Sequence, residues 1–201
     1  MADEVVQTPF GKFLIDQRDL IGSTTKAGTL WDGPGFLEVI AEEYGELGTP
    51  GVTILDVGAN QGMFSVWLAY HHAWRVLAVE PVPVVMQRLK ANLDLNRSLC
   101  AKVVIPIEVA AYDRTATLYC PLLDPGNWGG TALMGGTALT PQGRLLPTVR
   151  AEPLEDYLWC MGTWVSLIKI DAQGCDGVAI YGCHKILERD HPALVFEWEA
   201  D

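Results

Sequence analysis

The strongest chemical signal in the sequence is the segment DVGANQG at residues 56–62, which joins a hydrophobic stretch to a helical pattern. In such a strand-to-helix turn, small residues let backbone N–H groups approach a nucleotide-like ligand that also faces the helix N-terminus. We expect Gly58 and Gly62 to supply that space. Asn60 stands where a third glycine might be expected, and asparagine tolerates a left-handed backbone best after glycine.

The acidic start of this segment bears on which ligand it binds. The dinucleotide fingerprint GxGxxG is not met, because Asn60 and Met63 occupy its second and third glycine positions, which counts against NAD. Asp56, two residues before Gly58, would repel a pyrophosphate but suits a ligand with a free amino group and a sulfonium charge. S-adenosyl-L-methionine has both, so it is the predicted cofactor, and an NAD-dependent oxidoreductase is the less favoured alternative of the same fold.

A second acidic residue, Glu80, ends the next hydrophobic stretch in the string VEP. A carboxylate about 20 residues beyond such a turn can accept hydrogen bonds from ribose hydroxyls. A glutamate at a strand end is by itself compatible with a solvated surface. Its distance from DVGANQG favours the ribose role.

Two charged residues close a later hydrophobic stretch, where IKID places Lys169 and Asp171 two positions apart. Side chains alternate along a strand, so both are expected to face one site. An aliphatic hydroxyl is a very weak acid, and its proton must leave as it attacks a methyl donor. Asp171 is therefore the predicted base, with Lys169 orienting the hydroxyl or pairing with the carboxylate; a purely structural Lys–Asp pair is the alternative.

The elements around these residues alternate between strand and helix, which predicts an α/β fold with a mostly parallel central sheet and helices on both faces. The expected strands are 52–58, 75–80, 103–111, 165–171 and 193–199, and the expected helices are 35–47, 63–72, 84–96, 153–159 and 175–187. We expect one domain over residues 1–201, in which 1–50 form an N-terminal cap of hairpin and helix and 51–201 a Rossmann-like core.

Residues 124–143 are rich in Gly, Thr and Pro and show neither the hydrophobic period of a helix nor that of a strand, which predicts a long loop. The loop is either an ordinary mobile insertion or a lid over the substrate.

Composition excludes several classes of function. The net charge of −11 argues against a nucleic-acid partner, because phosphate contacts need clustered Lys and Arg. The sequence has no basic n-region with an apolar h-region and no long uncharged stretch, so we expect a cytoplasmic protein without a membrane partner. The five cysteines form no CxxC pair and the histidines have no ligand spacing, so neither disulfides nor a metal site is expected.

Taken in order, five strings resemble the motifs of the FkbM family of methyltransferases over about residues 11–197: DVGANQGMFS, AVEPVP, EVAAYDRTATLY, SLIKIDAQGCDGVAIYG and PALVFE. The resemblance implies a Rossmann-like class I methyltransferase fold, bound S-adenosyl-L-methionine and O-methyl transfer to a small-molecule hydroxyl acceptor, on a sugar or a polyketide-like product. It also suggests that Asp113 contacts adenine. The alternative for Asp113 is a turn residue, since Asp is common in turns.

Two departures from the family pattern stand out. The turn after Asp171 reads DAQGCD where the family usually reads close to DVEGxE, and the terminal β-hairpin typical of class I methyltransferases is apparently missing after the fifth strand. A non-catalytic cofactor-binding module of the same fold is therefore an alternative. The acceptor and the oligomeric state are left open by the sequence.

Overall fold

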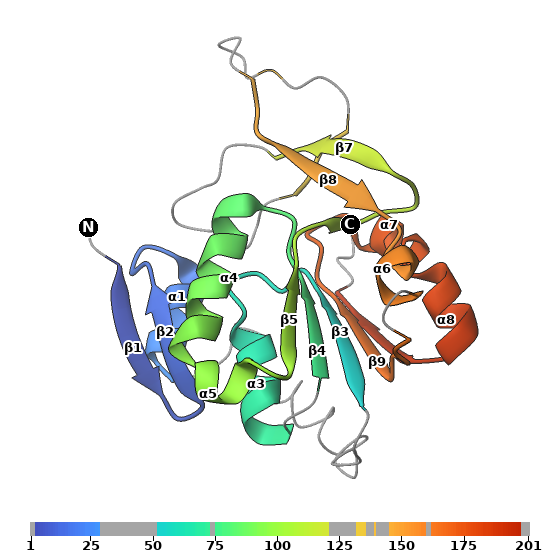
Figure 1. The fold of residues 1–201 in the computed structure, drawn as a ribbon. Helices are drawn as coiled ribbons and strands as arrows, with labels where there is room; N and C mark the ends of the chain where they lie inside the picture. The colour runs from blue at the N-terminus through green and yellow to red at the C-terminus, as the bar shows by residue number, and fades with distance from the viewer. Residues whose placement is uncertain are drawn as a thin grey trace.

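The computed structural model of the chain describes residues 3–28, 52–72, 75–120, 132–135, 139, 145–159 and 162–197 (Figure 1). The helix expected at 35–47 and most of the loop expected at 124–143 lie outside the described residues.

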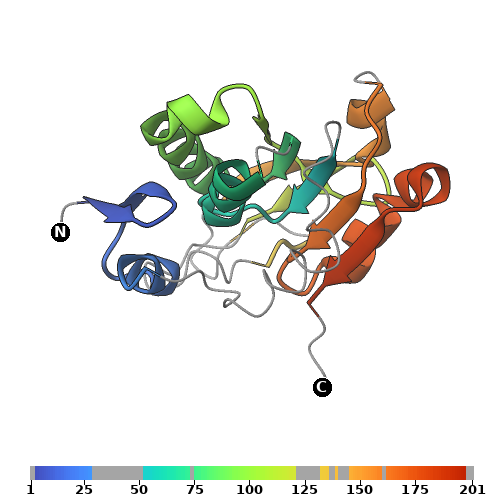
Figure 2. The same cartoon turned by 90° about the horizontal axis from the view of Figure 1, so that it is seen from below.

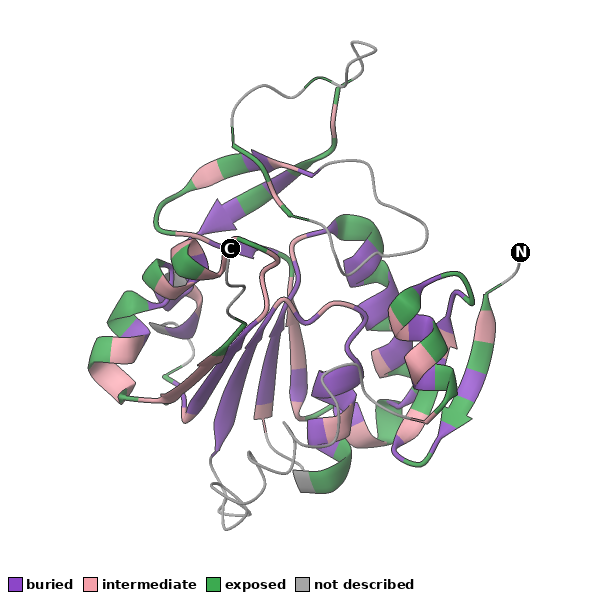
Figure 3. Cartoon of the chain, turned by 180° about the vertical axis from the view of Figure 1, so that it is seen from behind, coloured by how far each residue is buried: buried purple, intermediate pink, exposed green. Residues whose placement is uncertain are grey.

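The centre of the molecule is a five-stranded sheet in the order β10-β9-β3-β4-β5, and every pair of neighbours is parallel. Its strands are β3 (Thr53–Val57), β4 (Arg75–Val79), β5 (Val104–Ile107), β9 (Leu167–Ile170) and β10 (Ala193–Phe196). Strands β3 and β9 are buried along their whole length (Figure 3). The predicted α/β fold with a parallel sheet is confirmed.

Helices cover both faces of this sheet. The helices are α3 (Met63–His72), α4 (Pro83–Leu95), α5 (Arg97–Cys100), α6 (Glu155–Trp159), α7 (Asp176–Tyr181) and α8 (His184–Asp190). Alternate strand residues belong to two cores: Ile54 and Val76 pack with α3 and α4, whereas Leu55 and Leu77 pack with α6 to α8. This two-sided burial explains why the strands are continuous hydrophobic runs.

The prediction of a single helix at 175–187 is wrong, because the chain forms α7 and α8 with a break at Gly182 and Cys183. A Cβ at Gly182 would lie 2.6 Å from the backbone nitrogen of Tyr112, so the close approach of that segment requires glycine at the end of α7. The glycine was the available sequence signal for the break.

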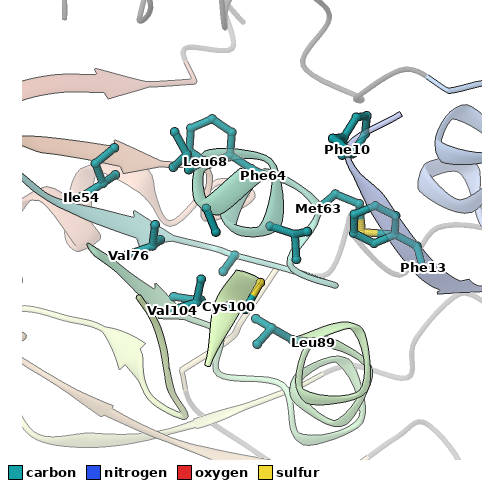
Figure 4. Close-up of a cluster of buried hydrophobic side chains, with 14 of the residues drawn as sticks. Phe10, Phe13, Ile54, Met63, Phe64, Leu68, Val76, Leu89, Cys100 and Val104 are labelled. Carbon is teal, nitrogen blue, oxygen red and sulfur yellow. The ribbon is translucent and has the colours of Figure 1, made fainter. Parts of the chain in front are cut away.

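The N-terminal cap comprises the hairpin of β1 (Glu4–Thr8) and β2 (Gly11–Ile15) with helix α1 (Leu20–Lys26). It packs outside α4, and Phe10 and Phe13 reach the core beside Met63 (Figures 2 and 4). Two asparagines of the α4 region hold β2 in place. The Asn92 Oδ1 atom accepts from the Leu14 N–H at 2.7 Å, and the Asn96 Oδ1 atom accepts from the Lys12 N–H at 2.9 Å.

A smaller sheet in the order β6-β8-β7 lies across one end of the central sheet (Figure 1). It comprises β6 (Ala110–Ala111), β7 (Ala116–Tyr119) and β8 (Thr148–Glu152). The strand expected at 103–111 is therefore divided, since β5 pairs with β4 whereas β6 pairs with β8. Among the described residues, no helix is long and apolar enough to cross a membrane.

Candidate functional site

The site lies where the order of the central sheet changes direction. From β3 the chain proceeds to β4 and β5 on one side, while β9 and β10 lie on the other. Ligands of open α/β sheets bind in the crevice outside the carboxyl ends of strands at such a point. Here Gly58 directly follows β3 and Asp171 directly follows β9, and a Cβ at Gly58 would lie 1.8 Å from the Asp171 carbonyl oxygen.

The DVGANQG turn has the left-handed backbone that the sequence suggested. The φ angles are 76° at Gly58, 50° at Asn60 and 83° at Gly62. Gly62 does not line the crevice but packs against α4, because a Cβ there would lie 3.1 Å from the Leu89 Cγ atom. Its small size therefore serves helix packing.

Three backbone N–H groups of the turn, those of Gly58, Ala59 and Asn60, form hydrogen bonds within the protein. The Gly58 and Ala59 N–H groups both donate to the Val79 carbonyl at 2.9 Å, and the Asn60 N–H donates to the Glu80 Oε2 atom at 3.0 Å. These bonds lock the ends of β3 and β4 together. These three N–H groups are therefore already satisfied without a ligand.

Glu80 is fixed in the crevice by two backbone donors. Its Oε1 atom accepts from the Val82 N–H at 2.8 Å, while Oε2 accepts from Asn60, and the residue is 6% exposed. The pKa of the Glu80 carboxyl is raised to about 7, chiefly by burial and to a smaller extent by the nearby Asp56 and Asp171 carboxylates, against the lowering effect of the two N–H groups. Each carboxylate oxygen can accept a further hydrogen bond.

Two pockets flank the turn, and Gly58, Asn60 and Asp171 line both of them. The larger pocket, of about 680 Å³, contains Glu80 against walls that are mostly apolar, among them Val82, Val109, Ala110, Ala111, Leu118 and Leu133. The smaller one, of about 450 Å³, is called the polar pocket here; it is lined by Asp56, Lys169, Asn60, Gln61 and Asp171, with Ile21, Met63 and Phe64.

Lys169 lies between two carboxylates in the polar pocket. Its Nζ atom is 3.9 Å from the Asp56 Oδ1 atom and 3.5 Å from the Asp171 Oδ2 atom, and the residue is 6% exposed. The Ser65 hydroxyl donates to the Asp56 Oδ2 atom at 2.6 Å. Two carboxylates and one ammonium leave one negative charge in excess, which favours a cationic ligand group.

Asp171 is the most accessible of the three charged groups, with 25% of its side chain exposed. Its Oδ1 atom accepts from the Gln173 Nε2 atom at 2.6 Å. Asp176 stabilises the following DAQGCD turn by accepting from the Ala172 and Gly174 N–H groups at 3.1 Å each. The turn that departs from the family pattern is thus internally hydrogen-bonded.

Asp113 is not brought to the site. It is exposed, forms an ion pair with Arg114 at 2.9 Å and lines neither pocket, whereas the preceding Ala111 and Tyr112 line the larger one. This placement fits the turn interpretation of Asp113. It gives no support to adenine contact by its side chain.

Sequence reasoning missed Gln61, which is 1% exposed and lines the polar pocket. Its Nε2 atom donates to the Asp19 Oδ2 atom of the N-terminal cap at 2.6 Å. A polar residue between Asn60 and Gly62 was the available signal, but its partner lies far away in the chain. The described part of the chain contains no cluster of His, Cys, Asp and Glu suited to a metal ion.

Comparisons with known proteins complete the description. Residues 56–201 match the family model described as the Methyltransferase FkbM domain. A solved structure, the "delta-N METTL16 MTase domain", is similar to this chain with 10% sequence identity and a TM-score of 0.40; the similarity covers 77% of this chain and 54% of that one. No curated protein matches the sequence.

Proposed function

The chain belongs to the FkbM family of methyltransferases, which use S-adenosyl-L-methionine, and from this premise we propose that it methylates a hydroxyl oxygen of a small molecule, either a sugar or a natural product. The observation that carries this proposal is the position of Asp171. Its carboxylate is partly exposed, lies 3.5 Å from a buried ammonium and belongs to both pockets at once.

The larger pocket has the features that an adenosyl group requires. Its apolar walls suit a purine ring, and Glu80 keeps acceptor capacity on both carboxylate oxygens for the two ribose hydroxyls. The polar pocket, on the other side of Gly58, suits the amino-acid end of the cofactor. Its excess negative charge complements the ammonium and the sulfonium.

The cofactor supplies an activated methyl group, so the protein has to hold a hydroxyl in line and accept its proton. Asp171 would take the proton at a carboxylate oxygen. Lys169 would keep that carboxylate oriented before the reaction, since its ammonium lies 3.5 Å away. Because the main site groups are carboxylates and amides, the acceptor is a neutral hydroxyl compound rather than an anion.

Methylation of a panel of hydroxylated sugars and natural products, with an isotope-labelled methyl donor and mass-spectrometric detection, tests this function. We expect label in an ether linkage of at least one hydroxyl compound. Binding of S-adenosylhomocysteine without transfer to any acceptor would favour the non-catalytic alternative. Transfer to nitrogen or carboxylate oxygen alone would contradict the hydroxyl acceptor.

Cofactor affinity is expected to depend on pH through Glu80. Its folded-state pKa of about 7 lies above the usual value of 4.5, so between those values the folded protein holds a proton that the unfolded chain releases. The contribution of Glu80 to stability therefore falls as pH rises through this window. Ribose hydroxyls need the ionised carboxylate, so S-adenosylhomocysteine should bind about tenfold more weakly at pH 6 than at pH 8.

Calorimetric titration at the two pH values measures this dependence. In Glu80→Gln, which keeps the shape but cannot ionise, binding should be weaker at pH 8 and nearly independent of pH. Equal affinity of the wild type at both pH values would mean that the Glu80 carboxylate does not hold the ribose.

A further inference from the structure

The N-terminal cap places a buried acid, Asp19, in contact with the DVGANQG turn. Asp19 is fully buried, and its Oδ2 atom accepts from the Gly22 N–H at 3.2 Å, where it caps helix α1. The same oxygen accepts from the Gln61 Nε2 atom at 2.6 Å. A single carboxylate oxygen thus joins the cap to the DVGANQG turn.

This hydrogen bond fixes which way the Gln61 amide faces. Because Nε2 is the amide atom that donates to Asp19, Oε1 faces away from that carboxylate. The Gln61 backbone is held as well, because its carbonyl oxygen accepts from the Asn92 Nδ2 atom at 2.8 Å. Neither the side chain nor the backbone of Gln61 can turn without breaking a buried bond.

Two side-chain amide oxygens at the polar pocket still require donors. Gln61 Oε1 and Asn60 Oδ1 are buried and have no hydrogen-bond partner within the described residues. Both residues line the polar pocket, together with the Asp56 and Asp171 carboxylates. Buried acceptors without donors are costly, and a primary ammonium, with three N–H donors, is the ligand group that satisfies several acceptors at once.

We propose that Gln61 binds the ammonium group of the cofactor through Oε1, and that Asp19 is the positioning residue that presents this oxygen to the polar pocket. The N-terminal cap is then a working part of the cofactor site as well as a packing element. This inference rests on the proposed function, because it takes the amino-acid end of S-adenosyl-L-methionine as the occupant of the polar pocket.

Two ligands distinguish binding in the larger pocket from binding in the polar pocket. S-adenosylhomocysteine has the adenosine and the amino-acid end, whereas 5′-methylthioadenosine has the adenosine and thioether alone. In Gln61→Met, which keeps the length of the side chain without its polar atoms, calorimetry should show S-adenosylhomocysteine binding weakened about tenfold or more. Binding of 5′-methylthioadenosine should stay unchanged.

Asp19 variants test the positioning role. Asp19→Ala removes the acceptor that holds Nε2, so it should weaken S-adenosylhomocysteine binding about fivefold without affecting 5′-methylthioadenosine. Asp19→Asn still offers an oxygen to Gly22 and Gln61, and it should restore most of the affinity. The matched control is Asn96→Ala, which loosens the cap at Lys12, away from the pocket, and should leave the ratio of the two affinities at the wild-type value.

Failure of the proposed function and failure of this inference give different results. If the wild type binds neither ligand, the proposed function fails. If the wild type binds both, but Gln61→Met and Asp19→Ala change the two affinities by the same factor, Gln61 has only a structural role and the inference is overturned.

Discussion

Replacement of Asp171 by asparagine is expected to lower kcat by about 10²- to 10⁴-fold, the range by which a positioned general base accelerates a reaction. The amide occupies the space of the carboxylate and can still accept from Gln173, but it cannot take a proton. The affinity for S-adenosylhomocysteine should change little, because Glu80, Asp56 and the apolar walls of the larger pocket are unchanged. Single-turnover transfer of a labelled methyl group, together with calorimetry, measures both quantities.

The matched control for this variant is Asp113→Asn. Asp113 is a second acid that follows a strand, but it pairs with Arg114 in an exposed turn and lines neither pocket. It should leave kcat and cofactor affinity unchanged. If Asp171→Asn retains the wild-type rate, the base lies elsewhere or proton removal does not limit the reaction.

Replacement of Gly58 by alanine is expected to destabilise the protein by about 4 kcal/mol or more, which is at the severe end for single substitutions. Two effects combine at this position. A left-handed φ of 76° disfavours any residue with a Cβ, and that atom would lie 1.8 Å from the Asp171 carbonyl oxygen. Strands β3 and β9 would have to separate where the two pockets meet.

Thermal unfolding measures this loss. The melting temperature should fall by roughly 10 °C, at about 2–4 °C per kcal/mol for a chain of this size. Gly174→Ala separates the two effects, because Gly174 has a similar φ of 81° and no atom within 4 Å of an added Cβ. It should cost only about 1 kcal/mol. If Gly58→Ala is no worse than Gly174→Ala, the ends of β3 and β9 are not in contact.

Periodicity was sufficient to predict the five-stranded core, because strands buried on both faces are continuous hydrophobic runs and the helices between them follow a different period. It failed where the tertiary contact decides the local structure. Helix 175–187 breaks at Gly182 because another segment lies against that glycine, and β6 leaves the central sheet to pair with β8. The segment against Gly182 and the partner strand of β6 both lie far away along the chain, so local sequence patterns do not reveal them.

Some features of the candidate site were likewise predictable from the sequence, whereas others were not. The glycine turn and Glu80 were found from spacing, since a strand end fixes where a side chain lies relative to the sheet edge. The destination of each hydrogen bond was not predictable: the Gly58 and Ala59 N–H groups bind Val79, and Gln61 binds Asp19 of the cap. Asp113 matched a family pattern by position, yet its side chain lies in an exposed turn.

The central claim is that the crevice beside Gly58 and Glu80 binds an adenosyl group joined to a cationic amino-acid end. Parallel calorimetric titrations of the wild-type protein with S-adenosylhomocysteine and with NAD at pH 8 test it most directly. We predict saturable binding of S-adenosylhomocysteine at one site and no heat from NAD, because Asp56 and Asp171 would repel its pyrophosphate. Tight binding of NAD with no response to S-adenosylhomocysteine would contradict it.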